Sequence, residues 1–308
     1  MSEKIKIDPC GVLLVNKHKG VTSHDIVYKV RRLFGTKKVG HTGTLDPLAT
    51  GVLVVLVGRA AKAAEYLVCD EKKYRAVIRL GLTSDSEDIT GNILSVSDNF
   101  PDFDAVKQVC AEFVGNIKQI PPMYSALKVD GKKLVDLARE GKIIERQARD
   151  ITIHSLSVTP TDSETDYILD VHCSSGTYIR TLCADIGARL GCGAVMAELN
   201  RCEAGGFSVE NSHSIEELEQ MSEGEKMEML IPIESLFSSL DGVRLEAFYE
   251  KLSRNGCEIY QKKVKTSFDV GTRVRMLNSK GEFYALGEVR EYADGTAIKA
   301  IKLFDLQE

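Results

Sequence analysis

A single carboxylate stands in a short glycine-rich segment at residues 40–51, which reads Gly-His-Thr-Gly-Thr-Leu-Asp-Pro-Leu-Ala-Thr-Gly. Asp46 precedes Pro47, and a proline restricts the backbone of the residue before it to extended conformations. An apolar, β-branched run at residues 52–57 follows and predicts a buried strand. A stiff loop mounted on a buried strand is a common way to present a functional side chain, so Asp46 is a candidate. An Asp-Pro pair between glycines is also typical of an ordinary turn, and spacing alone leaves both interpretations open.

Tyr74 and Arg180 are two further side chains that could work with a carboxylate. Tyr74 lies on the apolar side of an alternating segment at residues 73–80, which predicts a half-buried strand. A tyrosine at such a position is more often part of the core than of a catalytic site. Arg180 falls in the first turn of a predicted helix that Thr177 could cap, where the helix dipole disfavours a cation. It therefore suggests a nearby anion, either Asp46 or a phosphate, unless it is a surface arginine lying along its helix.

The elements that must hold these residues are strands mixed with amphipathic helices. Apolar runs predict further buried strands at residues 12–15 and 167–173. Apolar residues at helical spacing predict helices at residues 26–34, 60–67, 103–113 and 179–190. The acidic segment at residues 83–88 lacks the spacing of a calcium loop, so it predicts a solvated turn.

The charge of the chain is unevenly distributed. The net charge of −5 argues against a nucleic-acid partner when taken alone. However, residues 1–80 carry 15 Lys and Arg against 7 Asp and Glu, and residues 251–308 carry 11 against 8. Residues 210–250, between them, carry 2 against 11. The two basic regions could meet RNA phosphates, although solvated surface charge without a ligand remains the alternative.

Length and composition set outer limits. A chain of 308 residues suits two domains. There is no apolar stretch long enough to span a bilayer and no signal-peptide core at the N-terminus, so we expect a soluble, cytoplasmic protein without membrane association. The 8 cysteines form no C-x-x-C pair and have no histidines at zinc-ligand spacing. They therefore predict buried, reduced thiols and no metal site.

The C-terminal part has a different pattern from the rest. Short strands are predicted there at residues 263–265, 273–277, 283–289 and 297–304. Glycine-containing turns separate the later strands at residues 278–281 and 294–295. These features predict a small β-barrel joined to the first domain by an acidic, helical connector at residues 210–235.

Six segments in order along the chain resemble the TruB family of bacterial tRNA pseudouridine-55 synthases. The matching segments are residues 11–17, 20–25, 40–51, 74–75, 119–141 and 171–182. The resemblance implies an α+β fold, in which a mixed-sheet catalytic domain spans residues 1–240 and an RNA-binding arm is inserted at about residues 121–150. Residues 250–308 resemble the PUA module, a small RNA-binding β-barrel.

The resemblance also implies a chemistry. Such an enzyme isomerises uridine 55 in the T loop of tRNA to pseudouridine, with no cofactor, metal or obligate protein partner. Asp46 would be the nucleophile, Arg180 would keep it ionised, and Tyr74 would stack on the flipped base and help remove its C5 proton. His41 would fill the space that the flipped base leaves. Further pocket residues would be Lys17, Tyr178 and Leu199.

Two other classes of function stay open at this point. An RNA-binding module without catalysis would explain the basic regions but not the Asp46 loop. A hydrolase with a carboxylate nucleophile would need a second carboxylate about 5–10 Å from the first. None stands out near the matching segments.

Overall fold

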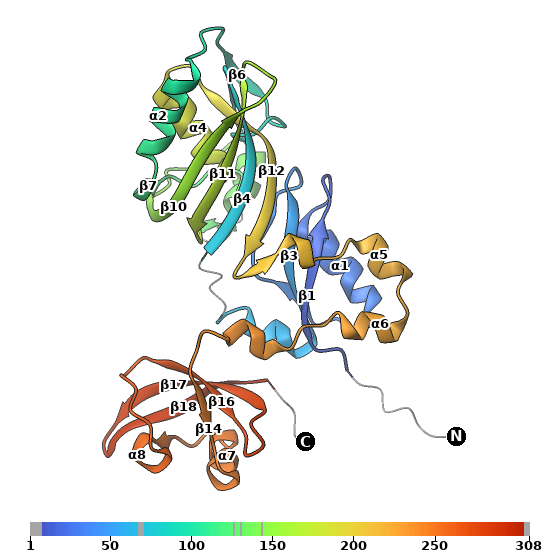
Figure 1. The fold of residues 1–308 in the computed structure, drawn as a ribbon, viewed down its shortest axis with the longest axis vertical. Helices are drawn as coiled ribbons and strands as arrows, with labels where there is room; N and C mark the ends of the chain where they lie inside the picture. The colour runs from blue at the N-terminus through green and yellow to red at the C-terminus, as the bar shows by residue number, and fades with distance from the viewer. Residues whose placement is uncertain (1–7, 67–70, 126, 130, 143, 305–308) are drawn as a thin grey trace.

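A nine-stranded mixed sheet forms the centre of the larger part of the molecule (Figure 1). The structure is a computed structural model that describes residues 8–66, 71–125, 127–129, 131–142 and 144–304. The strand order is β1-β3-β12-β4-β11-β10-β7, with β2 paired to β3 and β13 to β12. The strands are β1 (Gly11–Lys17), β2 (Val39–His41), β3 (Thr50–Val57), β4 (Glu71–Leu80), β7 (Gly115–Gln119), β10 (Arg149–Pro160), β11 (Asp166–Ser174), β12 (Ala194–Ala204) and β13 (Phe207–Ser208).

The burial of each strand follows its sequence pattern. Strand β3 is apolar on both faces, and every residue from Gly51 to Val57 is buried because the strand is covered from two sides. Strand β4 alternates, with Tyr74, Ala76, Ile78 and Leu80 buried, as the sequence predicts. The pairing of β3 with β12 is parallel and makes the sheet mixed.

Three helices, α1 (Ser23–Leu33), α2 (Phe103–Glu112) and α4 (Ile179–Leu190), pack on this sheet and share its main core. Helix α1 begins at Thr22, whose side chain forms a capping box with Asp25. Helix α4 ends at Gly191, which is left-handed with φ 79°. The expected Thr177 cap is wrong, because Tyr178 is the N-cap residue and the Thr177 hydroxyl donates to the Ser174 carbonyl instead.

Two short excursions leave the sheet. The first is a hairpin of β5 (Leu82–Ser84) and β6 (Ile93–Val96). The expected solvated turn at residues 83–88 is wrong here, because Ser84, Ser86 and Asp88 are buried. The second is the insertion after Gln119, which contains β8 (Lys128–Val129), β9 (Lys132–Lys133) and α3 (Leu134–Arg139).

The acidic connector is built from short elements. These are η2 (Val209–Asn211), α5 (Ile215–Gln220), α6 (Glu223–Glu228) and η3 (Ile233–Phe237). Both short α-helices begin with serine capping boxes, at Ser214 and Ser222.

In the first domain, the helix expected at residues 60–67 is a 3₁₀ helix, η1 (Gly58–Ala63). No helix of the described segments is long and apolar enough to cross a lipid bilayer.

A second, five-stranded sheet curls into a half-barrel at the C-terminal end, with strand order β14-β16-β17-β18-β15 (Figure 1). Its elements are β14 (Gly242–Arg244), α7 (Ala247–Arg254), β15 (Ile259–Tyr260), α8 (Gln261–Val264), β16 (Arg273–Leu277), β17 (Phe283–Tyr292) and β18 (Gly295–Leu303). The strand expected at residues 263–265 is wrong, because residues 261–264 form a helical turn and Lys265 is left-handed with φ 54°. The sheet already includes Gly242, so it begins before residue 250.

The two sheets are joined by an apolar core. Leu286 and Phe304 of the C-terminal part belong to one buried cluster that also contains Val12, Leu14 and other residues of β1 and β3. The rings of Phe237, Phe283 and Phe304 also pack together, with centroids 5.5 to 5.7 Å apart. Burial of this kind disfavours separation of the two parts.

Candidate active site

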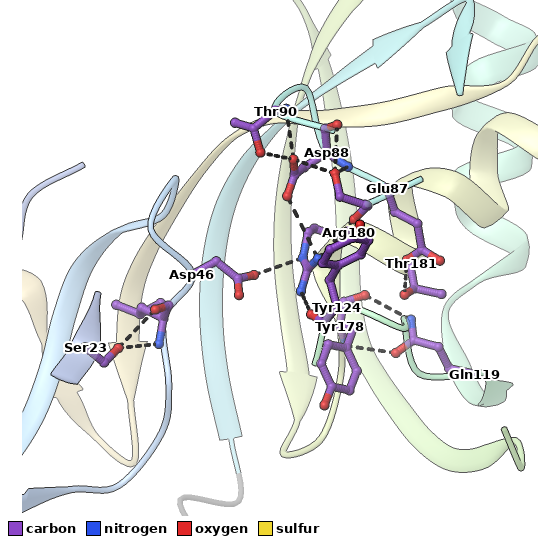
Figure 2. A network of polar contacts seen from close by, with 12 residues as sticks. Ser23, Asp46, Glu87, Asp88, Thr90, Gln119, Tyr124, Tyr178, Arg180 and Thr181 are labelled. Atoms are coloured by element: carbon purple, nitrogen blue, oxygen red, sulfur yellow. Dashed lines mark hydrogen bonds and ion pairs between the residues drawn. The ribbon is translucent and has the colours of Figure 1, made fainter. Parts of the chain in front are cut away.

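The loop that carries Asp46 connects β2 to β3 and is fixed by hydrogen bonds on both sides of the carboxylate. The buried Ser23 hydroxyl accepts from the Leu45 amide at 2.8 Å and donates to the Leu45 carbonyl at 3.0 Å (Figure 2). On the other side, the Gly20 amide donates to the Pro47 carbonyl at 2.8 Å. The sequence predicted a stiff loop from Pro47 alone, and the Ser23 anchor adds a second cause of stiffness.

Arg201 supports the same loop from the adjacent strand and was not predicted. Its side chain is only 2% exposed, and it donates from Nε to the Val52 carbonyl at 2.8 Å and from Nη2 to the Gly43 carbonyl at 3.1 Å. The parallel pairing of β12 with β3 brings its backbone against Gly51. Gly51 has φ 103°, and a Cβ there would lie 2.3 Å from the Arg201 carbonyl, so glycine is required. No strand was predicted around Arg201, so no local signal marked it.

Arg180 makes a direct ion pair with Asp46, with 2.9 Å between Nε and a carboxylate oxygen (Figure 2). This confirms the anion expected near Arg180 and excludes a solvated surface arginine, because its side chain is 4% exposed. Its other nitrogens donate to the Ser86 carbonyl at 3.0 Å and the Tyr124 carbonyl at 2.8 Å. The guanidinium is therefore fixed on three sides.

Asp88 is a second carboxylate at this arginine, and sequence reasoning missed it. One of its oxygens lies 3.9 Å from Nη1 of Arg180. The other accepts from the Ser86 hydroxyl at 2.9 Å, the Thr90 amide at 2.9 Å and the Thr90 hydroxyl at 2.6 Å (Figure 2). The neighbouring Glu87 is left-handed with φ 64° and accepts from the Thr181 hydroxyl of α4. This segment thus holds the start of α4 in place.

The electrostatics of Asp46 result from opposing effects. Burial raises the pKa of its carboxyl above the ordinary value, Arg180 lowers it, and the nearby Asp88 raises it. The side chain keeps 37% of its surface exposed, so a substrate can reach the carboxylate.

Lys17 lies beneath the loop and is fully buried. Its ammonium donates to the Val21 carbonyl at 2.8 Å and the His18 carbonyl at 3.1 Å, and it lies 3.5 Å from the Pro47 carbonyl. Burial lowers its pKa to about 8, while Asp46 opposes that shift. The structure therefore places Lys17 as a support of the loop.

Tyr74 is buried on β4, where it is paired with Val171 on one side and Arg201 on the other. Burial raises the pKa of its hydroxyl, and Arg201 opposes the shift. The hydroxyl is therefore neutral at ordinary pH. His41 lies on β2 at the start of the loop, and burial lowers the pKa of its imidazole, so it too is neutral at pH 7.

The remaining expected pocket residues lie on β12 and at the start of α4. Leu199 is 8% exposed, and its carbonyl accepts from the Thr50 hydroxyl at 3.3 Å. Tyr178 is held by Gln119, which accepts from its amide at 2.8 Å and donates to its carbonyl at 3.0 Å (Figure 2). The whole arrangement offers one accessible carboxylate, held by a buried cation, beside aromatic side chains.

The sequence of the chain matches known families along most of its length. Residues 31–179 match the family described as TruB family pseudouridylate synthase (N terminal domain), and residues 180–238 match the tRNA pseudouridylate synthase B C-terminal domain. The tRNA pseudouridine synthase B of Clostridium novyi (strain NT) is 42% identical over 278 residues, which cover 90% of this chain and 94% of the relative. The chain belongs to the TruB family. The tRNA pseudouridine synthase B of Neisseria meningitidis serogroup A / serotype 4A (strain DSM 15465 / Z2491) extends the similarity to 96% of this TruB chain and 94% of the relative, at 37% identity.

Solved structures confirm the predicted α+β fold for this TruB chain. A chain of the "Crystal Structure of a Cbf5-Nop10-Gar1 Complex" superposes with a TM-score of 0.71 at 24% identity and covers 96% of this chain and 85% of that one. The "Structure of H/ACA RNP bound to a substrate RNA containing 2'-deoxyuridine" gives a TM-score of 0.70 at 22% identity, with coverage of 97% and 86%. At this identity the likeness concerns the fold alone. The PUA character of the C-terminal half-barrel stays a prediction.

Proposed function

We propose that this TruB chain converts uridine 55 in the T loop of tRNA to pseudouridine, with Asp46 as the nucleophile. The observation that carries the assignment is the ion pair between Asp46 and the buried Arg180, at the centre of a loop that Ser23 and Arg201 hold rigid. A fixed cation keeps the carboxylate ionised and directed without reorganisation during the reaction. Family membership supplies the reaction type.

The isomerisation needs few groups. The bond between N1 of uracil and C1′ of ribose breaks, the base turns, and a new bond forms between C5 and C1′. C5 then loses a proton and N1 gains one, so no electrons leave or enter the system. Asp46 stabilises or captures the ribose carbon while the base turns, and Arg180 holds the carboxylate between these steps.

Tyr74 and the surrounding residues receive the base. The ring of Tyr74 stacks on the flipped uracil. Its neutral hydroxyl helps to remove the proton from C5. His41 occupies the space left in the RNA. Tyr178 and Leu199 border the base, and Lys17 supports the loop from beneath. These roles rest on the family resemblance and on the burial described above.

The C-terminal half-barrel would add affinity for the RNA as a PUA-like module. Helix α8 presents Lys262 and Lys263 at its exposed surface, and Lys265 follows it. Such lysines attract phosphates without reading sequence. The T stem-loop is the proposed substrate element, and the reaction requires no protein partner, membrane or cofactor. It would take place in the cytoplasm, where tRNA is processed.

One observation favours the hydrolase alternative, because Asp88 is a second carboxylate close to Arg180. A glycosidase would need this carboxyl to donate a proton to the leaving group. Asp88 instead accepts hydrogen bonds from Ser86 and Thr90 and is only 5% exposed. An acceptor that is buried in this way is unsuited to protonate a base in the substrate.

The test is nucleoside analysis of a T-arm hairpin RNA after incubation with the full chain in the presence of excess EDTA. The proposal predicts pseudouridine at the position of uridine 55 and an intact strand. Release of free uracil would establish a hydrolase, and unchanged RNA with measurable binding would establish a binding module. Either of these results would overturn the proposal.

A further inference from the structure

Two histidines and one glutamate come together on the face of the sheet opposite Tyr74, outside the site described above. They are Glu71 of β4, His154 of β10 and His172 of β11, and their ligand atoms all lie within 4.8 Å of one another. Glu71 is 2.9 Å from Nε2 of His172 and 4.0 Å from Nε2 of His154. The two imidazole rings have centroids 4.8 Å apart. We propose that these three side chains form a binding site for a divalent transition-metal ion such as Zn²⁺.

The backbone arranges this juxtaposition. Strand β10 has a bulge between Ile153, which pairs with Cys173, and Ser155, which pairs with His172. His154 is therefore an extra residue on that strand, and its ring lies beside that of His172. A bulge redirects a side chain in this way and interrupts the hydrogen bonds between the two strands. Bulges are common beside functional sites.

Glu71 reaches the same place through the register of β4. It pairs with Ser174, two residues from His172, so that Glu71 and His172 are diagonal neighbours on one face. The buried residues Val171 and Cys173 alternate with His172 and point to the opposite, helix-covered face. The three ligands thus come from three adjacent strands and meet on the exposed face.

The chemistry of the set selects the ion. Two imidazoles and one carboxylate suit zinc, nickel, cobalt or copper, whereas magnesium and calcium prefer sites made of oxygen alone. Zinc binds histidine nitrogen at about 2.0–2.1 Å, so its ligand atoms lie roughly 3.3 Å apart in a tetrahedral site. Glu71 and His154 have side chains that are 58% and 36% exposed and can rotate toward an ion, which would replace the hydrogen bond of 2.9 Å between Glu71 and Nε2 of His172. Three protein ligands leave one position for water.

The cation beside the cluster in the ladder is paired with a carboxylate. Lys73, which pairs with His172 in the ladder, has its ammonium in an ion pair with Glu203 at 2.9 Å. A bound ion would link β4, β10 and β11 on the face opposite α2 and α4. The sequence predicts no metal site because these three ligands are far apart along the chain, and only the sheet brings them together.

The experiment measures Zn²⁺ binding to the full chain by calorimetry, with Co²⁺ as a spectroscopic probe. Four cysteines are replaced by serine so that no accessible thiol competes: Cys257, which is exposed, Cys10 and Cys202, which are half-buried, and Cys69, which lies outside the described residues. We expect one Zn²⁺ per chain with micromolar affinity, visible d–d absorption with Co²⁺, and a rise in Tm on addition of Zn²⁺. His154→Gln, His172→Gln and Glu71→Gln should each weaken binding by at least about tenfold.

The matched control is His18→Gln, which removes an exposed histidine that has a glutamate, Glu216, 3.9 Å away but forms no three-ligand cluster with other described residues. It should leave Zn²⁺ binding unchanged. Equal Tm values for all variants without metal show that each is folded. No binding at micromolar Zn²⁺, or binding that persists in both histidine variants, would overturn the proposal.

Discussion

At the scale of single residues, the protonation state of Asp46 depends on Arg180. Burial raises the pKa of Asp46, and the proposed mechanism needs the ionised form, so activity should be lost as the pH falls through that raised value. Arg180 opposes the shift, and its removal should raise the pKa further. Arg180→Gln should therefore move the acid limb of the pH–rate profile to higher pH and lower the rate at neutral pH.

The matched control for this variant is Arg189→Gln, on the same helix, which removes an exposed ion pair with Glu112. Single-turnover rates across a pH series measure both variants. The Arg189 variant should keep the parent profile, since exposed ion pairs contribute little. If the acid limb is identical in the Arg180 variant and the parent, Arg180 does not control the pKa of the Asp46 carboxyl.

The hydroxyl and the ring of Tyr74 can be tested separately. If the hydroxyl assists removal of the C5 proton, Tyr74→Phe should bind RNA normally but lose about 10²–10⁴-fold in rate. Tyr74→Leu should lose affinity as well, because stacking of a base on an aromatic ring contributes about 1–3 kcal/mol. Tritium release from C5-labelled RNA gives the rate, and filter binding gives the affinity. If the phenylalanine variant is as fast as the parent, the Tyr74 hydroxyl takes no part in the reaction and Tyr74 is only a core residue.

At the scale of elements, the Asp46 loop depends on α1 through Ser23. Ser23→Ala leaves the Leu45 amide and carbonyl buried without this partner, which should lower the free energy of unfolding by about 1–3 kcal/mol. A loosened loop should also slow the chemical step, because small displacements of catalytic groups cost up to about 10²-fold in rate. Urea unfolding and single-turnover kinetics measure the two effects. Ser267→Ala, at an exposed serine, is the control and should change neither.

The elements also show what local sequence can predict. Helix α4 and strand β16 have nearly the expected bounds, because apolar periodicity and Gly191 determine them locally. Asp88 was expected in a solvated turn, yet it is buried against Arg180, which is distant in the sequence. The residues 261–264 are helical rather than extended, and the buried Gln261 there bonds both the amide and the carbonyl of Phe268. Contacts of this kind depend on tertiary structure and leave no periodic signal.

The same distinction holds for the site. Loop chemistry and helix position made Asp46 and Arg180 candidates, but an ordinary turn and a surface arginine stayed open, and only the family resemblance implied their roles. Arg201 could not be assigned a role, since its contacts with Val52 and Gly43 arise only when β12 pairs with β3 in parallel. Long-range strand pairing therefore completed a site of which the sequence revealed only the centre.

At the scale of the whole molecule, the C-terminal half-barrel is packed against the catalytic sheet through Leu286, Phe283 and Phe304. Deletion of the half-barrel would expose the apolar surface around Phe237. A loss of RNA affinity in the truncated chain could then result from lower folding stability and not from lost RNA contacts. Exposed lysines offer a cleaner test. Lys263→Gln combined with Lys265→Gln should weaken binding to full tRNA and reduce the salt dependence of affinity by about one unit of slope per lost phosphate contact.

The same double variant should keep the parent's single-turnover rate at saturating RNA, because these lysines lie in the half-barrel rather than at Asp46. Affinity is measured across a salt series, and the rate from the pseudouridine formed. An unchanged salt slope would show that this face of the half-barrel does not touch RNA. A greatly slowed chemical step would show that the half-barrel shapes the catalytic site.

In the proposed mechanism the Asp46 carboxylate performs the chemistry, and Asp46→Asn removes that carboxylate. The amide keeps the size of the side chain but cannot act as an anionic nucleophile. We predict that nucleoside analysis finds no pseudouridine after prolonged incubation of the T-arm RNA with this variant. RNA affinity should stay within about tenfold of the parent, equivalent to ~1.4 kcal/mol. Pseudouridine formation at a rate near that of the parent would contradict the account.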